Sequence, residues 1–590
     1  MSLEDLSFSP GFYSDDTDRD VGKAGYWKDG DKVRFLHGLP QKMGGWIADN
    51  VAASMSGTAR GVVDWLSLRD ERFIAFGTHL KLYVWLGGVF YDITPVRASS
   101  TINNNPFSMT DTSTTVTVTD TAHGATDGAY VTFSGAAAAG GITIDGEYQL
   151  TYVDADSYTI THSAAATSTT TGGGASVTAA YQINPGQEDS LVQYGWGVGT
   201  WGAETWGTAR SSSTTIAAAR TWALDLWGED LIACHFDGNI YVWDSSVGTG
   251  TRATLIAAAP TDNKAAFVSQ EARHLVALGA GSDPLQIKWS TSEDYTDWTA
   301  TTTNTAGDKR VDKGSQLLRA IQYKDVHLVF TDAAVYSMQY VGPPYVFSVE
   351  PIGTNGGLAG PNAVVEYSGI CYWMGTENFY MYDGTVRPIP CPVYETVFRD
   401  YNADQAFKVW AGANSRFNEI WWLYCSADSD EIDRYVVFNP IEKHWVFGTL
   451  ARTLYVGDSD VINNPYAVSS DGKLYYHDFG TNADGAAIDA YIVSGDVEIP
   501  KAGEQMMHVD KIVPDFKRLT DSVNITLTAK KYPQDTETQA SSALAINSST
   551  KFVNPRVRGR QMSVRVESTS ITADWRMGVL RLGVRPHGKR

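Results

Sequence analysis

Two runs of closely spaced acidic residues carry the oxygen ligands that calcium takes in proteins. They are Asp15, Asp16, Asp18 and Asp20 near the start, and Asp428, Asp430, Glu431 and Asp433 further along. A calcium-binding loop also needs a glycine at its sharp turn and a distal glutamate, and neither run has this complete pattern. We interpret both runs as solvated turns and predict no metal site, with calcium binding as the alternative.

A glycine-rich stretch at 194–210 contains the spacing of a dinucleotide-binding loop, in Gly197, Gly199 and Gly202. Such a loop needs a strand before it, a helix after it and an acidic residue about 20 positions later. Here tryptophan interrupts the loop and no helix is predicted to follow, so we reject a nucleotide site. Tryptophan is enriched at the centres of protein interfaces. We predict a packed loop at a subunit interface, formed by Trp196, Trp201 and Trp206.

No other motif indicates a catalytic centre. The sequence has no phosphate-binding Gly-x-x-x-x-Gly-Lys loop, no His-Glu-x-x-His and no Gly-x-Ser-x-Gly. The histidines are scattered and the four cysteines form no close pair, so neither type indicates a metal site or a disulfide. His235, His274 and His327 fall on or beside predicted strands, where we expect packed side chains. The sequence therefore predicts a protein that is not an enzyme and that has no cofactor.

The composition favours strands over helices. Of the 590 residues, 12% are aromatic, 19% are charged and 55 are glycine. Tyr, Trp, Thr and Val pack well on pleated sheets, and glycine supplies tight turns. Because one core stops growing at roughly 250–300 residues, we expect more than one domain. No apolar run approaches the roughly 18 residues of a membrane helix, and the start is acidic where a signal peptide is basic, so we expect no membrane segment.

A hairpin recurs seven times along the chain, each time as an apolar strand, a short turn and a second strand rich in aromatic residues. The hairpins span 72–85, 230–244, 273–289, 325–340, 369–384, 419–440 and 464–478. From Tyr241 onward, equivalent positions recur every 40–55 residues, which is the period of β-propeller blades. One blade cannot cover its own apolar face, so blades stack. We predict an all-β fold built on a β-propeller of about seven blades, with unrelated hairpins in sandwiches as the alternative.

The spacing of the hairpins suggests the domain boundaries. The block 99–186 has seven acidic residues and no Lys or Arg, and its alternating strands predict an inserted sandwich of immunoglobulin-like (Ig-like) size. The propeller then comprises 61–98 and 187–489. Residues 490–590 alternate like strands and predict a C-terminal β-domain with a basic tail. Residues 1–60 are rich in turns and are predicted to be an extended segment that packs on the propeller or completes a blade.

Charge is unevenly distributed along the chain. The net charge is −21, yet residues 551–590 contain ten Lys or Arg against only Glu567 and Asp574, which gives this end +8 and leaves −29 for the rest. A protein this acidic is a poor nucleic-acid binder overall, although it can line a channel that DNA crosses without adhering. Three arginines alternate along a predicted strand of the basic end and are candidate contacts for an acidic partner. They are Arg556, Arg558 and Arg560.

Several short motifs resemble the tail nozzle proteins of short-tailed bacteriophages (podoviruses), also called tail tubular protein B or tail hub proteins. Near the start they are Pro10-Gly11, Trp27, Asp31-Lys32-Val33-Arg34-Phe35, Gly38-Leu39-Pro40 and Gly44-Gly45-Trp46. Later they are Thr121-Ala122-His123-Gly124, Gly146-Glu147-Tyr148, Arg558-Gly559-Arg560-Gln561 and Trp575-Arg576-Met577-Gly578.

That resemblance implies a structural virion protein, made in the host cytoplasm and placed in the short tail. It implies a homo-oligomeric ring, a hexamer, below the head-to-tail adaptor protein, with tail fibres or tailspikes at the side. Double-stranded DNA would pass through the lumen during ejection without sequence-specific binding. The family supplies no catalytic residues to transfer to this chain.

Two other functions stay open from the sequence. The first is a receptor- or glycan-binding propeller of a phage tail, which could also hydrolyse glycans through acids that are distant in the chain. The second is an intracellular scaffold of the WD-repeat kind, which the chain supports less well because Trp243-Asp244 is a single Trp-Asp pair. Our sequence-based prediction is the tail nozzle subunit.

Overall fold

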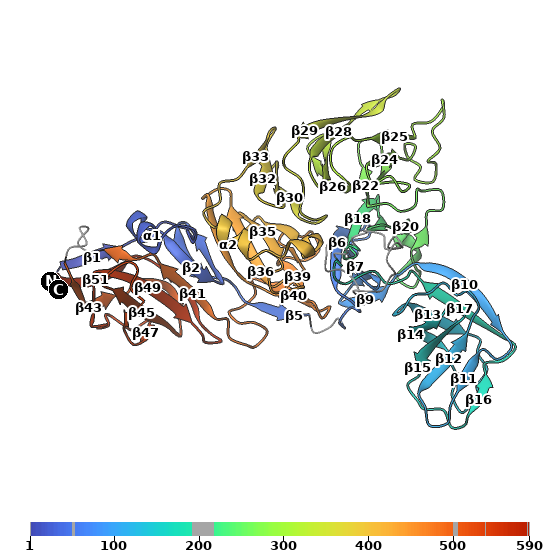
Figure 1. The fold of residues 1–590 in the computed structure, drawn as a ribbon, viewed down its shortest axis with the longest axis horizontal. Coiled ribbons are helices and arrows are strands. Elements are labelled where there is room, and N and C mark those ends of the chain that lie inside the picture. Colours follow the sequence, from blue (N-terminus) through green and yellow to red (C-terminus); the bar gives the residue numbers. More distant parts are fainter. Residues whose placement is uncertain are drawn as a thin grey trace, which may run out of the picture. The chain divides into compact units, whose positions relative to one another are not determined.

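The computed structural model describes residues 2–49, 53–191, 217–498, 505–536, 538–586 and 588. Within them nearly every element is a strand (Figure 1). The short helices are α1 (Asp18–Ala24), α2 (Tyr394–Arg399) and the 3-10 turns η1 (Ser245–Val247) and η2 (Ala403–Lys408). The chain divides into two compact units. Unit 1 comprises Met1–Ala52, Ile321–Met338 and Glu350–Arg590, and unit 2 comprises Ala53–Ala320 and Gln339–Val349.

Three of the four-stranded propeller sheets belong to unit 2. The first is β6 (Ala59–Leu66), β7 (Arg72–Thr78), β8 (Leu82–Leu86) and β9 (Val89–Asp92). The second is β18 (Trp222–Trp227), β19 (Asp230–His235), β20 (Ile240–Trp243) and β21 (Thr254–Leu255). The third is β22 (Ala265–Ser269), β23 (His274–Leu278), β24 (Gln286–Trp289) and β25 (Gly307–Arg310).

Three more such sheets belong to unit 1. They are β30 (Val364–Tyr367), β31 (Ile370–Met374), β32 (Phe379–Tyr382) and β33 (Val386–Pro388); β34 (Trp410–Asn414), β35 (Glu419–Tyr424), β36 (Arg434–Asn439) and β37 (His444–Thr449); and β38 (Leu454–Val456), β39 (Tyr466–Val468), β40 (Leu474–His477) and β5 (Trp46–Ala48). One further sheet has residues in both units. It is β26 (Leu317–Tyr323), β27 (Val326–Thr331), β28 (Val335–Gly342) and β29 (Val346–Gly353).

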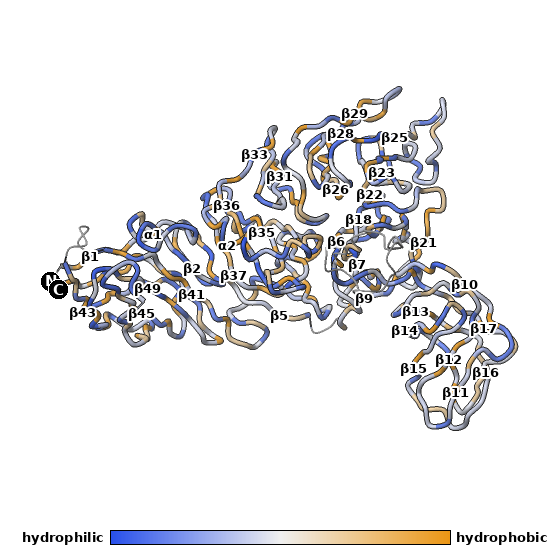
Figure 2. The backbone as a smooth tube through the Cα atoms, viewed as in Figure 1, coloured by the Kyte–Doolittle hydropathy of each residue, from blue (hydrophilic) through white to orange (hydrophobic). Residues whose placement is uncertain are grey.

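Each of the seven hairpins found in the sequence is the second and third strand of one of these seven sheets. The predicted fold class is confirmed: the protein is all-β, with seven β-propeller sheets, an inserted Ig-like sandwich and a C-terminal β-domain. Figure 2 shows hydrophobic and hydrophilic residues interspersed along the strands, as expected for sheets that bury alternate side chains.

The side chain of Trp222 packs against Gly77 and brings the first two propeller sheets of unit 2 into contact. Trp222 begins β18 and is 1% exposed. A Cβ atom on Gly77 of β7 would lie 2.2 Å from Cγ of Trp222, so the close approach requires a glycine there. The indole N–H of Trp222 donates to the carbonyl oxygen of Thr78 at 2.8 Å, which satisfies the buried donor.

The insert forms a two-sheet sandwich within unit 2. Its strands are β10 (Val96–Asn103), β11 (Phe107–Met109), β12 (Thr115–Thr119), β13 (Tyr130–Ser134), β14 (Gly146–Asp154), β15 (Ser157–Thr161), β16 (Thr170–Gly172) and β17 (Ser176–Gln182). The first half of β14 pairs with β13, and its second half pairs with β15, so this strand crosses from one sheet to the other. The core between the sheets includes the buried side chains of Val131, Tyr158 and Tyr181.

A cluster of charges ties the insert to the propeller sheets of unit 2. Lys81, between β7 and β8, is 4% exposed. Its ammonium pairs with Asp92 at 2.9 Å and with Glu147 of β14. Arg252 approaches the same two carboxylates, at 3.2 Å each. Two cations and two anions therefore balance at the base of the insert.

The C-terminal domain contains strands from both ends of the chain. Its first sheet is β1 (Ser2–Leu6), β51 (Leu580–Pro586), β43 (Met507–Val513) and β48 (Val557–Gly559). Its second is β2 (Trp27–Asp31), β41 (Ala490–Ser494), β49 (Gln561–Ser568), β45 (Ser522–Lys530) and β46 (Gln539–Ala540), with β42 (Val497–Glu498) and β47 (Leu544–Asn547) at its sides. Its third is β3 (Val33–Leu36), β4 (Leu39–Lys42), β50 (Asp574–Met577) and β44 (Phe516–Thr520).

The N-terminal segment contributes strands both to a propeller sheet and to the C-terminal domain, whereas the sequence predicted only packing on the propeller or completion of a blade. Strand β5 completes a propeller sheet, which was one expectation for residues 1–60. Strands β1 to β4 instead form sheets with strands of 490–590, as Figure 1 shows for β1 beside β51. In the part of the chain that the structure describes, no helix is long and apolar enough to cross a membrane.

Candidate functional site

The residues that the sequence predicts for an interface fall into two groups. The tryptophans Trp196, Trp201 and Trp206 lie outside the described residues, so their role stays a prediction. The arginines lie on or beside β48, the edge strand of the first C-terminal sheet, and they are Arg556, Arg558 and Arg560. Arg556 is exposed, and the guanidinium of Arg560 lies 4.8 Å from the ring centre of Tyr532. Their contact with an acidic partner also stays a prediction.

Asp15 of the first acidic run and Asp433 of the second accept hydrogen bonds from the backbone. Asp15 accepts the N–H groups of Glu395 at 2.7 Å and Thr396 at 3.1 Å, in the first turn of α2. Asp433 accepts the N–H of Ser426 at 2.8 Å across the β35–β36 turn. Among the described residues, no group of three or more His, Cys, Asp or Glu side chains is placed to hold a metal ion.

A buried charge cluster joins the N-terminal segment to the last two propeller sheets of unit 1. Arg34 of β3 is 3% exposed. Its Nε lies 3.0 Å from Oε1 of Glu419, which begins β35, and its Nη1 donates to Oδ1 of Asp478, which follows β40, at 2.7 Å. A cavity of about 20 Å³ adjoins the cluster, which is space for about one water molecule.

One guanidinium cannot neutralise two buried carboxylates. Burial, together with the charge of Asp478, raises the pKa of Glu419 to about 7, although Arg34 opposes this shift. Burial disfavours the charged guanidinium, but the charges of Asp478 and Glu419 raise the pKa of Arg34. The indole N–H of Trp421 donates to Glu419 at 3.0 Å. The arrangement is closed to solvent, so we interpret it as a structural joint whose charge balance depends on pH.

This joint gives unit 1 a pH-dependent stability. The ordinary pKa of glutamate is 4.5, and that of Glu419 is about 7 in the fold. A raised carboxyl pKa contributes stability that is fully present below about pH 4.5 and is lost as the pH rises to about 7, at about 1.4 kcal/mol per pKa unit. We expect Glu419→Gln to remove this part of the pH dependence. Urea denaturation at pH 5, 6, 7 and 8 measures it, and an unchanged slope in the variant would show that another group titrates.

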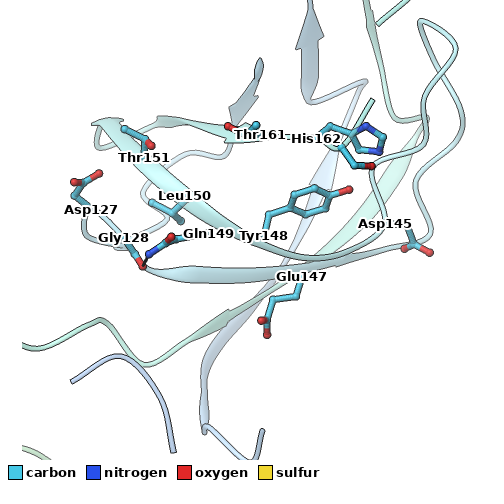
Figure 3. Close-up of a pocket in the computed structure, with 11 residues that line it drawn as sticks. Asp127, Gly128, Asp145, Glu147, Tyr148, Gln149, Leu150, Thr151, Thr161 and His162 are labelled. Atoms are coloured by element: carbon cyan, nitrogen blue, oxygen red, sulfur yellow. Dashed lines mark hydrogen bonds between the residues drawn. The ribbon is translucent and has the colours of Figure 1, made fainter. Parts of the chain in front are cut away.

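A polar groove runs along β14 and the end of β15 on the insert (Figure 3). Its volume is about 780 Å³. The side chains that matter for its chemistry are Asp127, Asp145, Tyr148, Gln149, Thr161 and His162. The groove lies where β14 crosses between the two sheets of the sandwich, because Gln149 is its last residue paired with β13 and Leu150 the first paired with β15.

Two rings form the floor of the groove. The rings of Tyr148 and His162 lie next to each other in Figure 3, with centroids 6.2 Å apart and an interplanar angle of 28°. Tyr148 is half-buried and packs against the core of the sandwich, with its ring centroid 6.0 Å from that of Phe133. Burial raises the pKa of the Tyr148 hydroxyl, so it is a neutral hydrogen-bonding group at neutral pH.

The charge in the groove is negative. Asp127 and Asp145 are exposed at its two ends, and none of its described lining residues is Lys or Arg. Glu147 also lines the groove; its side chain points away from Tyr148 in Figure 3 and pairs with Lys81. Alternation along the strand places Glu147 and Gln149 on one face of β14 and Tyr148, which packs on the core, on the other.

No sequence pattern indicated this groove. Tyr148 stood within a motif of the resemblance, and His162 was one of many scattered histidines. The groove forms where β14 changes its pairing partner from β13 to β15, and a single sequence does not reveal such a change. By contrast, the expected burial of His235, His274 and His327 is found, at 9%, 0% and 6% exposure.

Comparisons with known proteins find remote resemblances in solved structures. No family model and no curated protein matches this chain. The phage phi92 endosialidase is 9% identical, with a TM-score of 0.20, over 72% of this chain and 63% of that one, so the match spans less than two thirds of the endosialidase. An exo-β-1,3-galactanase from Phanerochaete chrysosporium is 9% identical, with a TM-score of 0.21, over 54% of this chain and 95% of that one. BBS1N in complex with ARL6DN is 9% identical, with a TM-score of 0.25, over 74% and 97%.

One prediction has to be corrected on this finding. The sequence motifs predicted that the chain is not an enzyme, yet two of these structures are by name an endosialidase and an exo-β-1,3-galactanase. The exclusion of an enzyme was therefore wrong. TM-scores of 0.20 and 0.21 are too low to assign a reaction to this chain. The chain is a β-propeller protein with an inserted sandwich.

Proposed function

We propose that this chain is a structural subunit in the tail of a short-tailed bacteriophage, of the nozzle kind that its motifs resemble. The observation that carries the proposal is where the N-terminal motifs lie in unit 1. They gather where the N-terminal segment pairs with the C-terminal domain and with the last propeller sheet. The resemblance therefore concerns the residues that hold the architecture together.

Several residues of the N-terminal motifs hold the N-terminal segment against the C-terminal domain and the propeller sheets of unit 1. Trp27 of β2 is 1% exposed. Asp31 accepts the N–H of Thr449, on β37, at 3.0 Å. A Cβ atom on Gly44 would lie 2.7 Å from Cα of Asp478, so the glycine permits the chain to pass. Side chains and close packing thus connect two propeller sheets with the C-terminal domain, which supports a stiff structural subunit.

In this function six copies form a ring around an axial lumen. The head-to-tail adaptor protein binds on one side, tail fibres or tailspikes attach at the periphery, and double-stranded DNA passes through the lumen. The net charge of −21 supports a lumen that does not retain DNA, because DNA binding depends on neutralising phosphates with Lys and Arg.

The charge balance leads to a direct prediction for DNA. Non-specific DNA-binding proteins have dissociation constants of about 10⁻⁴–10⁻⁶ M at physiological salt, so the tighter ones retard DNA at about 10 μM protein. Because the net charge of this chain is −21, we expect the purified full chain at that concentration not to retard a 50-base-pair duplex in a gel at roughly 0.15 M salt. At low salt, weak binding through the basic end is expected, and Arg556→Ala with Lys551→Ala should reduce it. Tight, salt-resistant retardation would contradict a lumen that lets DNA slide.

A second candidate function is glycan binding by the same tail protein, and the groove on the insert favours it. Pockets of about 300–1,000 Å³ with a few placed polar groups are typical of small-ligand sites. Saturation-transfer NMR with soluble oligosaccharides and the full chain tests this function. Transfer to sugar protons supports it, and no transfer to any sugar rejects it.

A further inference from the structure

We propose that the groove on the insert binds an uncharged sugar residue stacked on Tyr148 and that it excludes anionic glycans. This inference rests on the second candidate function, glycan binding, and it names the class of ligand. It does not depend on whether the chain forms the tail nozzle.

The size and shape of the groove suit a short stretch of glycan. Its volume of about 780 Å³ lies within the range for small-ligand sites and leaves room for more than one sugar ring. It is an open trough along β14 in Figure 3, and the strand that forms it is held at its base by the buried Lys81. An open trough accepts an internal segment of a longer chain as well as an end.

The lining provides the two kinds of contact that a sugar needs. A sugar ring has an apolar C–H face, and the half-buried ring of Tyr148 offers a fixed apolar surface whose position is set by packing on the core. A sugar also carries hydroxyl groups that both donate and accept. Carboxylates at Asp127 and Asp145 accept, and the hydroxyl of Thr161 can do both.

The charge of the insert selects against anions. Residues 99–186 contain seven acidic residues and no Lys or Arg. The two cations nearest the groove, Lys81 and Arg252, are already paired with Asp92 and with the lining residue Glu147, so their charges are neutralised before a ligand binds. A sialylated or phosphorylated ligand would therefore place its charge near Asp127 or Asp145, and none of the described lining residues is a lysine or arginine that could pair with it.

The test uses the purified full chain and three soluble probes: maltotriose, tri-N-acetylchitotriose and sialyllactose. We expect saturation transfer to at least one neutral trisaccharide and at least about tenfold weaker binding of sialyllactose, a difference of about 1.4 kcal/mol. Asp127→Asn with Asp145→Asn should narrow that difference. Equal or tighter binding of sialyllactose overturns the inference but leaves glycan binding in place, whereas transfer to none of the probes overturns both.

Variants locate the site. We expect Tyr148→Ala to weaken binding of the neutral probe at least about tenfold, through the lost ring face. Because Tyr148 also packs on the core, Asp145→Ala is a second variant at an exposed position and should weaken binding severalfold. The matched control is Tyr152→Ala, on the same strand, 45% exposed and not among the groove residues. Binding that survives Tyr148→Ala and Asp145→Ala, or that Tyr152→Ala removes, overturns the assignment to this groove.

Discussion

Replacing Arg34 with methionine is expected to lower the stability of unit 1 by about 3–5 kcal/mol, because it leaves two buried carboxylates without their cation. Glu419 and Asp478 lie 3.0 and 2.7 Å from the guanidinium, and the side chains are 3–8% exposed, so water cannot replace the lost charge. Methionine keeps most of the volume, so the effect reports charge rather than a cavity. Urea denaturation, with hydrogen exchange of peptides from β35 and β40, measures it.

The chain offers a matched control for this substitution. Arg416 approaches the same aromatic ring, that of Phe417, at 5.4 Å against 3.8 Å for Arg34, but it is exposed. We expect Arg416→Ala to cost less than about 0.5 kcal/mol. Combining Arg34→Met with Glu419→Gln and Asp478→Asn should recover part of the loss, since no charge then stays buried. Equal effects of Arg34→Met and Arg416→Ala would contradict a role for the buried pairing.

Replacing Trp222 with alanine is expected to destabilise unit 2 by about 3–5 kcal/mol. The side chain is 1% exposed and lies against Gly77 of the preceding sheet, where it fills the space between two propeller sheets. Its removal also leaves the carbonyl of Thr78 without the indole donor. We expect faster hydrogen exchange in β6, β7 and β18. The variant loosens the contact between two sheets, so strands of both sheets should exchange faster, and not β18 alone.

Trp298 provides the comparison for that variant. It belongs to the same unit, and its indole N–H also donates to a backbone carbonyl, that of Tyr295, at 2.8 Å, but it is only half-buried. Trp298→Ala should therefore cost clearly less than Trp222→Ala. A cost for Trp222→Ala below that for Trp298→Ala would show that the propeller sheets of unit 2 do not depend on this contact.

Local patterns were sufficient to predict the propeller. The two strands of each hairpin, such as β7 with β8 or β39 with β40, are close in sequence and carry aromatic residues at a repeated position. That information lies within about 20 residues. The inserted block was recognisable because its composition changes abruptly, with no Lys or Arg from 99 to 186.

Long-range pairing was beyond the sequence. Strand β1 pairs with β51 and β2 pairs with β41, across nearly the whole length of the chain, and the alternation of each strand fits many partners equally well. The Arg34 cluster was hidden for the same reason, since its two carboxylates come from β35 and from the residue after β40. The groove depends on one strand that changes sheet at Gln149, which alternation alone cannot reveal.

We propose that copies of this chain form a ring with an axial lumen. The most direct test is the absolute mass of the purified full chain by light scattering, combined with electron micrographs of the same sample and of the chain mixed with its adaptor protein. We expect six-fold rings with a central hole, at the mass of six chains, in at least the mixed sample. Monomers that form no ring in either sample would contradict it.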